Sequence, residues 1–246
     1  MKNLALIVLV LAWLSTTSYS TIAQEKLLTN QKPYGKLWTK VDSLLSMNAN
    51  ADSILSKIDR INTKAYKQND IPSIIKTIYY KAVLISNNRV KGRYDAIAYV
   101  ELELKQSKGL LTTLLQSMLA DLYLKLANDY SYSSSNKDSL TDNIRLWSKN
   151  QIKSRINELL LLSLTNEQSK TVDIRTFDVF DGNAYEERPT LFDYLSYYAI
   201  ENYKTQDWGR FIKYDPMLFS TDYFLSNPEP KYTVQSIYYR LLKFHR

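Results

Sequence analysis

The sequence contains no cysteine, a single histidine and only five glycines among its 246 residues. Without cysteine the chain has no disulfide, no thiolate metal site, no thiol nucleophile and no internal thioester. One histidine cannot build a multi-histidine metal site. This histidine, His245, is the penultimate residue, where a Ser-His-Asp triad is not expected, so we interpret it as a terminal surface residue. Few segments alternate apolar and polar residues, which disfavours β-strands.

The first 23 residues have the order of a secretory signal peptide. Lys2 supplies the charge, residues 4–14 form an apolar stretch, and small and polar residues follow. The eleven apolar residues are too few to span a bilayer, which takes about twenty. We predict cleavage after Ala23, with cleavage after Ser20 as the second choice. The mature protein is therefore expected in the periplasm or outside the cell, without a transmembrane segment.

The chain carries 32 Lys and Arg residues against 25 Asp and Glu residues. The basic excess is spread along the chain and forms no Lys/Arg block, which is typical of a solvated surface. Together with the predicted export, this distribution argues against nucleic acid as a partner. Residues 24–246 are enough for one large domain or two small ones, with a possible sub-boundary near residues 131–140.

Apolar residues recur at helical spacing along most of the mature chain. Residues 131–138 are expected to form a polar loop, and residues 165–188 and 205–230 irregular connections. The helix over residues 141–164 is expected to break near Asn150. The predicted helices begin near Leu37, Ala51, Ile71, Gly92, Leu110, Thr141, Pro189 and Tyr232. The side chains expected in the core are Trp38, Leu44, Leu122, Trp147, Leu195 and Leu241.

Two helical pairs, residues 51–87 and 94–130, resemble each other, and their second helices begin 39 residues apart, near Ile71 and Leu110. Antiparallel hairpins repeated in this way predict an all-α fold, either a tetratricopeptide-like solenoid or an irregular helical array. The last predicted helix, about residues 232–244, has an apolar face and no capping turn after it. This ending is typical of a truncated array.

An acidic cluster lies in the predicted connection 165–188. Its members are Asp173, Asp178, Asp181, Gly182 and Asn183. A calcium loop would use such oxygen ligands, but the spacing lacks the alternating ligand positions and the closing glutamate of that loop. We therefore interpret the cluster as a solvated connection and predict no metal ligand in it.

Two pairs of glutamates are the remaining candidates for a catalytic carboxylate pair. Glu101 and Glu103 are two residues apart on a predicted helix, so their side chains should point in different directions. Glu186 and Glu187 lie in a predicted loop beside Arg188, which we expect to be an ion partner. The sequence therefore predicts no catalytic, cofactor-binding or metal-binding residue, and the protein is not expected to be an enzyme.

Several short motifs, in order along the chain, resemble the N-terminal helical region of bacterial alpha-macroglobulin family proteins. They are Leu37-Trp38-x-x-Val41-Asp42-Ser43-Leu44, Ile144-x-x-Trp147 with Ser163-Leu164, Arg188-Pro189-Thr190-Leu191-x-Asp193-x-Leu195, and Tyr238-x-x-Leu241-Leu242-x-Phe244-His245. The resemblance implies a helical module, or a remnant of one, that precedes macroglobulin domains and contacts them or another protein. Protease trapping is not implied, because the chain has neither a thioester cysteine nor sandwich strands nor a recognisable bait segment.

The chain is also rich in tyrosine, with 20 residues. Aromatic surfaces bind sugars and peptides, so an alternative function is a stand-alone periplasmic helical-repeat protein that binds a peptide or a glycan. A purely structural spacer in the envelope is a further alternative. In the pairs Tyr79–Tyr80, Tyr197–Tyr198 and Tyr238–Tyr239 we expect one ring of each pair to face the core.

Overall fold

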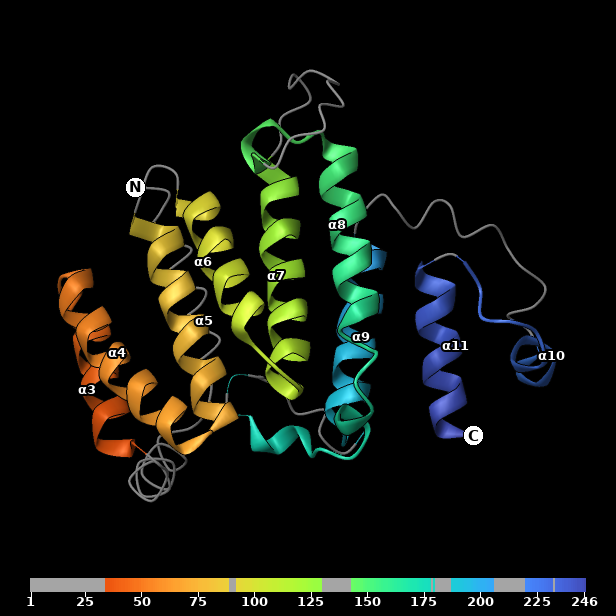
Figure 1. Cartoon of the computed structure of the whole chain (residues 1–246), viewed down its shortest axis with the longest axis horizontal. Coiled ribbons are helices and arrows are strands. Elements are labelled where there is room, and N and C mark those ends of the chain that lie inside the picture. The colour runs from red at the N-terminus through yellow and green to blue at the C-terminus, as the bar shows by residue number, and fades with distance from the viewer. Residues whose placement is uncertain are drawn as a thin grey trace. The chain divides into compact units, whose positions relative to one another are not determined.

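The computed structural model describes residues 34–88, 92–129, 143–177, 179, 187–205, 220–231 and 233–246. Over these ranges the chain is all-helical, with nine α-helices, three 3-10 helices and one isolated β-bridge (Figure 1). The all-α prediction is confirmed, whereas the tetratricopeptide-like arrangement stays a prediction. The predicted signal peptide and the predicted loop at residues 131–138 lie outside the described ranges. None of the described helices has the length and apolar content needed to cross a bilayer.

The chain divides into two compact units, one ending at Lys64 and the other beginning at Ala65. The first unit holds α3 (Gly35–Ser46) and most of α4 (Ala51–Gln68). Its buried side chains recur at helical spacing along both helices. They are Trp38, Val41, Ile54, Ile58 and Ile61. The Asn50 side chain accepts a hydrogen bond from the Asp52 N–H at 2.9 Å and so caps the start of α4.

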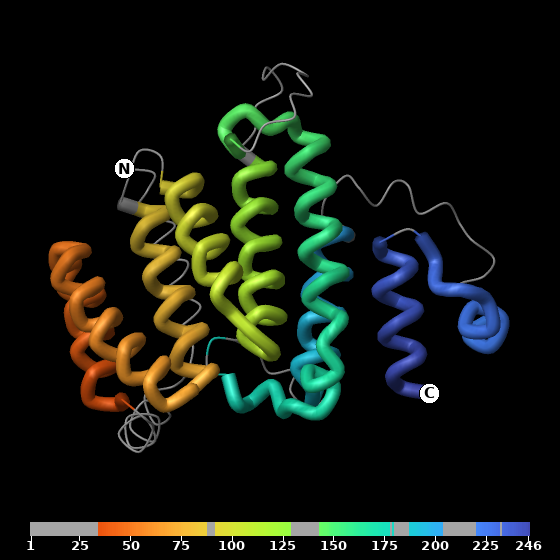
Figure 2. The backbone as a smooth tube through the Cα atoms, viewed as in Figure 1, coloured from red at the N-terminus to blue at the C-terminus, as the bar shows by residue number. Residues whose placement is uncertain are grey.

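In the second unit, four long helices follow one another up and down, each packed against the next (Figures 1 and 2). They are α5 (Ile71–Asn88), α6 (Gly92–Gln106), α7 (Leu110–Asp129) and α8 (Lys149–Leu162). The 3-10 helix η1 (Ile144–Leu146) precedes α8. The predicted start points of α5, α6 and α7 agree with the structure, because Pro72, Gly92 and Gly109 are local signals for the start of a helix.

The remaining helices of this unit are α9 (Leu191–Thr205), α10 (Thr221–Ser226) and α11 (Thr233–His245). Two 3-10 helices, η2 (Glu167–Lys170) and η3 (Ile174–Thr176), lie between α8 and α9 in the chain. α9 packs against α11 and η2, while α11 also contacts α8 and α10. α10 falls inside the predicted irregular connection 205–230, so that prediction is wrong for residues 221–226.

Local caps explain where two helices depart from the predicted bounds. α8 begins at Lys149 because Ser148 and Gln151 form a reciprocal capping box, so the break falls at residues 147–148 rather than at Asn150. α9 begins at Leu191, not Pro189, because Thr190 is its N-cap. The Thr190 hydroxyl oxygen accepts a hydrogen bond from the Asp193 N–H, and the Asp193 carboxylate accepts one from the Thr190 N–H. The proline therefore precedes the helix and does not lie in its first turn.

Gly92 begins α6 at a point of close backbone approach. A Cβ atom on this residue would lie 2.4 Å from the carbonyl oxygens of both Ile85 and Ser86, in the last turn of α5. Real Cβ atoms do not come this close to backbone oxygen, so only glycine allows the two helices to meet here. The residue type at this position is set by packing between α5 and α6.

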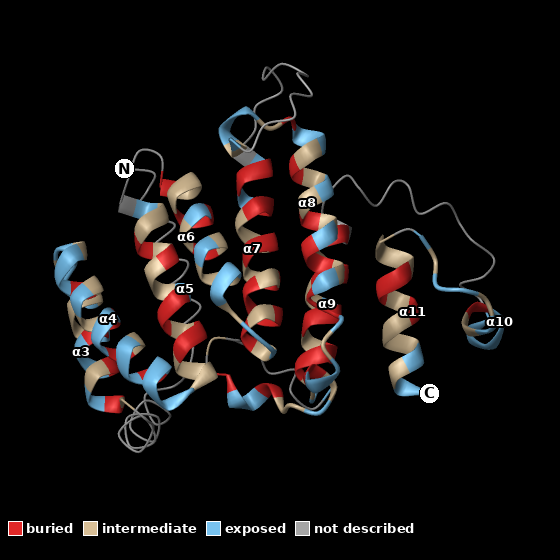
Figure 3. Cartoon of the chain, viewed as in Figure 1, coloured by how far each residue is buried: buried red, intermediate tan, exposed pale blue. Residues whose placement is uncertain are grey.

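Burial follows the helical stripes through the second unit (Figure 3). Among the six predicted core residues, Trp38 and Leu195 are buried, whereas Leu44, Leu122, Trp147 and Leu241 are only half-buried. Trp147 lies at the break before α8, where its indole stacks on the Tyr123 ring at 5.8 Å and does not enter the core. The prediction that these four side chains are largely buried was therefore too strong.

The tyrosine pairs also differ from one another in burial. Tyr79 and Tyr197 are exposed, and their neighbours Tyr80 and Tyr198 are half-buried. Only the third pair has a buried ring, which belongs to Tyr239. The expectation that one ring of each pair faces the core is thus met in full only on α11.

Candidate interaction surface

The start of α9 is fixed by a short antiparallel contact with the segment after η2. The Ile174 N–H donates to the Pro189 carbonyl oxygen at 3.0 Å, and the Leu191 N–H donates to the Val172 carbonyl oxygen at 2.9 Å. These bonds form the isolated bridge between Asp173 and Thr190. The turn that carries residues 188–190 therefore has a defined backbone position.

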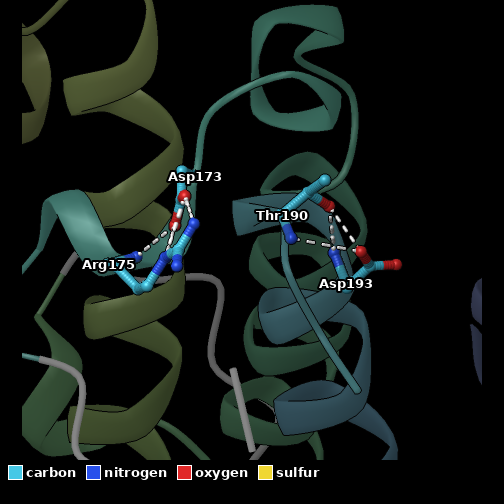
Figure 4. A network of polar contacts seen from close by, with 4 residues as sticks. All are labelled: Asp173, Arg175, Thr190 and Asp193. Atoms are coloured by element: carbon cyan, nitrogen blue, oxygen red, sulfur yellow. Dashed lines mark hydrogen bonds and ion pairs between the residues drawn. The ribbon is translucent and has the colours of Figure 1, made fainter. Parts of the chain in front are cut away.

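Asp173 is the described member of the predicted acidic cluster, and its carboxylate is fully engaged by Arg175 (Figure 4). The Arg175 Nε donates to both carboxylate oxygens at 2.9 Å. These hydrogen bonds lower the pKa of the Asp173 carboxyl below its ordinary value. The other four cluster residues lie outside the described ranges. Within those ranges, no three acidic or histidine side chains are placed to hold a metal ion.

Asp193 is the most deeply buried carboxylate at this end of α9, with its side chain 3% exposed. One carboxylate oxygen accepts hydrogen bonds from the Thr190 N–H at 3.2 Å and from the Thr190 hydroxyl at 2.7 Å (Figure 4). The other oxygen lies 2.7 Å from Nε2 of His245, at the end of α11. His245 is a surface residue, 54% exposed, as the sequence indicated, but it also joins α11 to α9.

The two carboxylates at residues 101 and 103 point to different neighbours. Glu101 accepts a hydrogen bond from the Tyr123 hydroxyl of α7 at 2.8 Å, and Glu103 accepts one from the Tyr66 hydroxyl at 2.7 Å. Burial, together with the neighbouring carboxylate, raises the pKa of both tyrosines above the ordinary value. These glutamates therefore join helices and do not face each other across a shared site.

Two further tyrosine hydroxyls tie α9 to the array of long helices. Tyr198 donates to the Asp121 carboxylate of α7 at 2.7 Å, and Tyr203 hydrogen-bonds the Asn157 side chain of α8. Burial raises the pKa of Tyr203 to about 12. The Tyr194 and Tyr198 rings lie parallel, with centroids 6.4 Å apart. Tyrosine hydroxyls on α9 therefore anchor this helix to both α7 and α8.

The exposed aromatic side chain of α9 is Tyr197, which contacts Arg188, and we call these two residues the Arg188–Tyr197 pair. The guanidinium carbon lies 3.2 Å from the centroid of the Tyr197 ring. The Arg188 side chain is 24% exposed, and Tyr197 is 37% exposed. The predicted ion pair with Glu187 is confirmed, with Oε2 of Glu187 3.8 Å from Nη2 of Arg188, although this distance is too long for a hydrogen bond. The stack on Tyr197 was not predicted from the sequence.

Comparison of the chain with family models, with curated proteins and with solved structures yields no significant match. The function is therefore inferred from the sequence of this chain and from its contacts.

Proposed function

We propose that this protein is a non-catalytic exported helical module that binds or positions a protein partner. One observation carries the proposal: carboxylates that reach the interior are engaged by side chains of another helix. Glu101, Asp121 and Asp193 contact Tyr123, Tyr198 and His245, respectively. Groups used in this way hold helices together.

The arrangement of Ser196, Asp193 and His245 also argues against hydrolysis. Ser196 follows Asp193 by one turn of α9, and its buried hydroxyl has no hydrogen-bond partner within the described part of the chain. A nucleophile must reach its substrate and be hydrogen-bonded to a base. Ser196 is 0% exposed and meets neither condition.

The resemblance to the helical region of alpha-macroglobulin family proteins supports a positioning function. One of its motifs, residues 188–195, coincides with the bridged turn and the cap of α9. In this proposal the module precedes macroglobulin domains and contacts them or another protein. The trapping reaction itself does not carry over, because a thioester requires a cysteine and the chain has none.

A second candidate is a stand-alone protein that binds a glycan. Exposed tyrosines favour it, because aromatic rings at a surface provide large and rigid contact areas. These are Tyr66, Tyr79, Tyr197 and Tyr223.

The test is to incubate purified residues 24–246 with trypsin, with an array of heptapeptides and with an array of neutral glycans. We expect neither covalent nor caged capture of trypsin, and selective binding to a subset of the peptides. Binding to glycans with no peptide bound would favour the second candidate. Capture of trypsin would refute the non-catalytic module.

A further inference from the structure

We propose that the Arg188–Tyr197 pair binds a single side-chain carboxylate of a protein segment, flanked by uncharged residues. This inference rests on the proposed function as a protein-binding module, and it names the place and the chemistry of binding. Both residues lie in the second unit, at the bridged turn and on the outer side of α9.

The guanidinium of Arg188 has donors to offer. An arginine carries five N–H donors in one plane. In the described part of the chain, the only acidic oxygen recorded near this guanidinium is Oε2 of Glu187, 3.8 Å from Nη2. The guanidinium carbon lies 3.2 Å from the Tyr197 ring centroid, and the Arg188 side chain remains 24% exposed and so accessible to a ligand. Arg175, by contrast, already donates hydrogen bonds to the Asp173 carboxylate.

A carboxylate fits this guanidinium better than a neutral sugar does. The planar fork of arginine matches the two oxygens of a carboxylate in a bidentate contact. A neutral sugar would need the open face of an aromatic ring, but the guanidinium already lies 3.2 Å over the Tyr197 ring. The ring also holds the guanidinium in place, which reduces the entropy lost on binding.

The surroundings favour one carboxylate over a polyanion. Glu187 is 78% exposed directly beside Arg188, and Glu201 lies one turn beyond Tyr197 on α9. These acidic groups would repel a densely charged polyphosphate or polyuronate chain. Tyrosine and arginine are also enriched among residues that dominate protein interfaces.

Backbone placement adds to the order of the pair. Pro189 follows Arg188 and fixes one of its own backbone dihedrals, while its carbonyl accepts the hydrogen bond from the Ile174 N–H. Arg188 is thus presented from a restrained turn. The entropy lost by Arg188 when a partner binds is therefore small.

The experiment uses full-length mature protein and an array of acetylated, amidated heptapeptides with Glu, Asp or Gln at the centre and uncharged residues elsewhere. Oligoglucuronate and inorganic phosphate form separate arms. The best Glu-centred peptide and its Gln twin are then measured by fluorescence anisotropy. We expect the Glu peptide to bind at least about tenfold more tightly than the Gln peptide.

Variants assign that preference to the pair. Arg188→Ala should abolish it, and Arg188→Lys should reduce it, because lysine keeps the charge but loses the planar fork. Tyr197→Phe should retain the preference for the Glu peptide, and Tyr197→Leu should weaken this preference. Arg175→Ala is the matched control, since it removes the same charge from an arginine that is already paired, and it should leave the preference unchanged.

The outcomes separate the inference from the function on which it rests. Peptide binding without a Glu preference, or equal losses in Arg188→Ala and Arg175→Ala, would overturn the carboxylate site and leave a peptide-binding module. Binding of oligoglucuronate or phosphate through Arg188, with no peptide bound, would overturn the assignment to a protein segment. Binding in no arm would overturn both proposals.

Discussion

The array α5–α8 and the pair α10–α11 belong to the same unit but are held together in different ways. α7 buries large side chains between its neighbours α6 and α8, including Leu115, Leu119 and Tyr123, each 0% exposed. On α11 only Ser236, Ile237 and Tyr239 are buried, and the other apolar side chains of its stripe are half-buried. Burial of apolar area is thus the main contribution to the stability of the array.

α11 depends instead on directed contacts near its C-terminal end. Arg240 donates to the Leu161 carbonyl oxygen of α8 at 3.1 Å. The Phe244 ring meets the Phe192 ring of α9 edge-on at 5.1 Å, and the His245 imidazole meets the Asp193 carboxylate. The array should therefore respond mainly to changes of volume, and α10–α11 mainly to changes of charge.

The largest expected effect is a cavity in the array. Leu119→Ala should lower the free energy of unfolding by about 2–5 kcal/mol, because the side chain is fully buried on α7. Leu242→Ala on α11 is the matched control and should cost much less, since Leu242 is half-buried. Urea unfolding followed by circular dichroism measures both. Equal losses would remove the distinction between the two regions.

A second prediction adds volume to the array. Gly92→Ala should cost about 1–3 kcal/mol, because its Cβ would overlap two carbonyl oxygens of α5. The control is Gly109→Asn, which retains the left-handed conformation (φ 61°) and whose Cβ meets nothing closer than 3.7 Å. Thermal unfolding of the two variants provides the comparison. A Gly92→Ala protein as stable as the parent would mean that α6 shifts freely on α5.

The helices of the array could be predicted from the sequence because their signals are local. Apolar spacing sets their faces, and Pro72, Gly92 and Gly109 mark their ends. α10 was missed because its six residues are too few for a periodic pattern, and its only signal is the cap Ser220, whose hydroxyl accepts from the Tyr223 N–H. The start of α8 was missed because a capping box outweighs apolar spacing over one turn.

The contacts between distant segments could not be predicted in this way. His245 and Asp193 are 52 residues apart, and Tyr198 and Asp121 are 77 apart. A single sequence specifies which faces are apolar but not which helix covers each face. The Arg188–Tyr197 pair was missed for a related reason. Its geometry depends on the bridged turn, which begins α9 two residues later than the proline indicated.

The third prediction removes a directed contact of α11. His245→Ala leaves the buried Asp193 carboxylate without its partner on α11, and we expect a loss of about 1–3 kcal/mol. Hydrogen exchange measured by mass spectrometry should show faster exchange in α11 than in the parent and little change in α7. Arg175→Ala, which breaks an exposed ion pair, is the control. Equal acceleration in both helices would mean that α11 and the array unfold as one.

The smallest expected effect is a dependence on pH at the junction of α10 and α11. The Glu229 carboxylate accepts hydrogen bonds from the Ser236 hydroxyl and from Arg240 Nε, the latter at 2.7 Å. Partial burial acts to raise the pKa of Glu229, but these hydrogen bonds and the charge of Arg240 outweigh it, so the pKa is lowered. The folded state therefore binds its proton less readily than the unfolded state does.

The sign of the effect follows from that lowered pKa. The stabilisation is complete above the unfolded pKa, about 4.3 for glutamate, and is lost as pH falls through the lower folded value. Because the Arg240–Glu229 pair is partly exposed, the change should stay below about 1 kcal/mol. Hydrogen exchange of α11 between pH 3 and pH 7, corrected for intrinsic rates, should show this loss in the parent and not in Glu229→Gln. Glu167→Gln removes an ion pair on η2 and should behave as the parent does. If Glu229→Gln kept the acid-induced loss in α11, the pH sensitivity of this helix would belong to another group, and Glu229 would contribute to α11 only as a neutral hydrogen-bond acceptor.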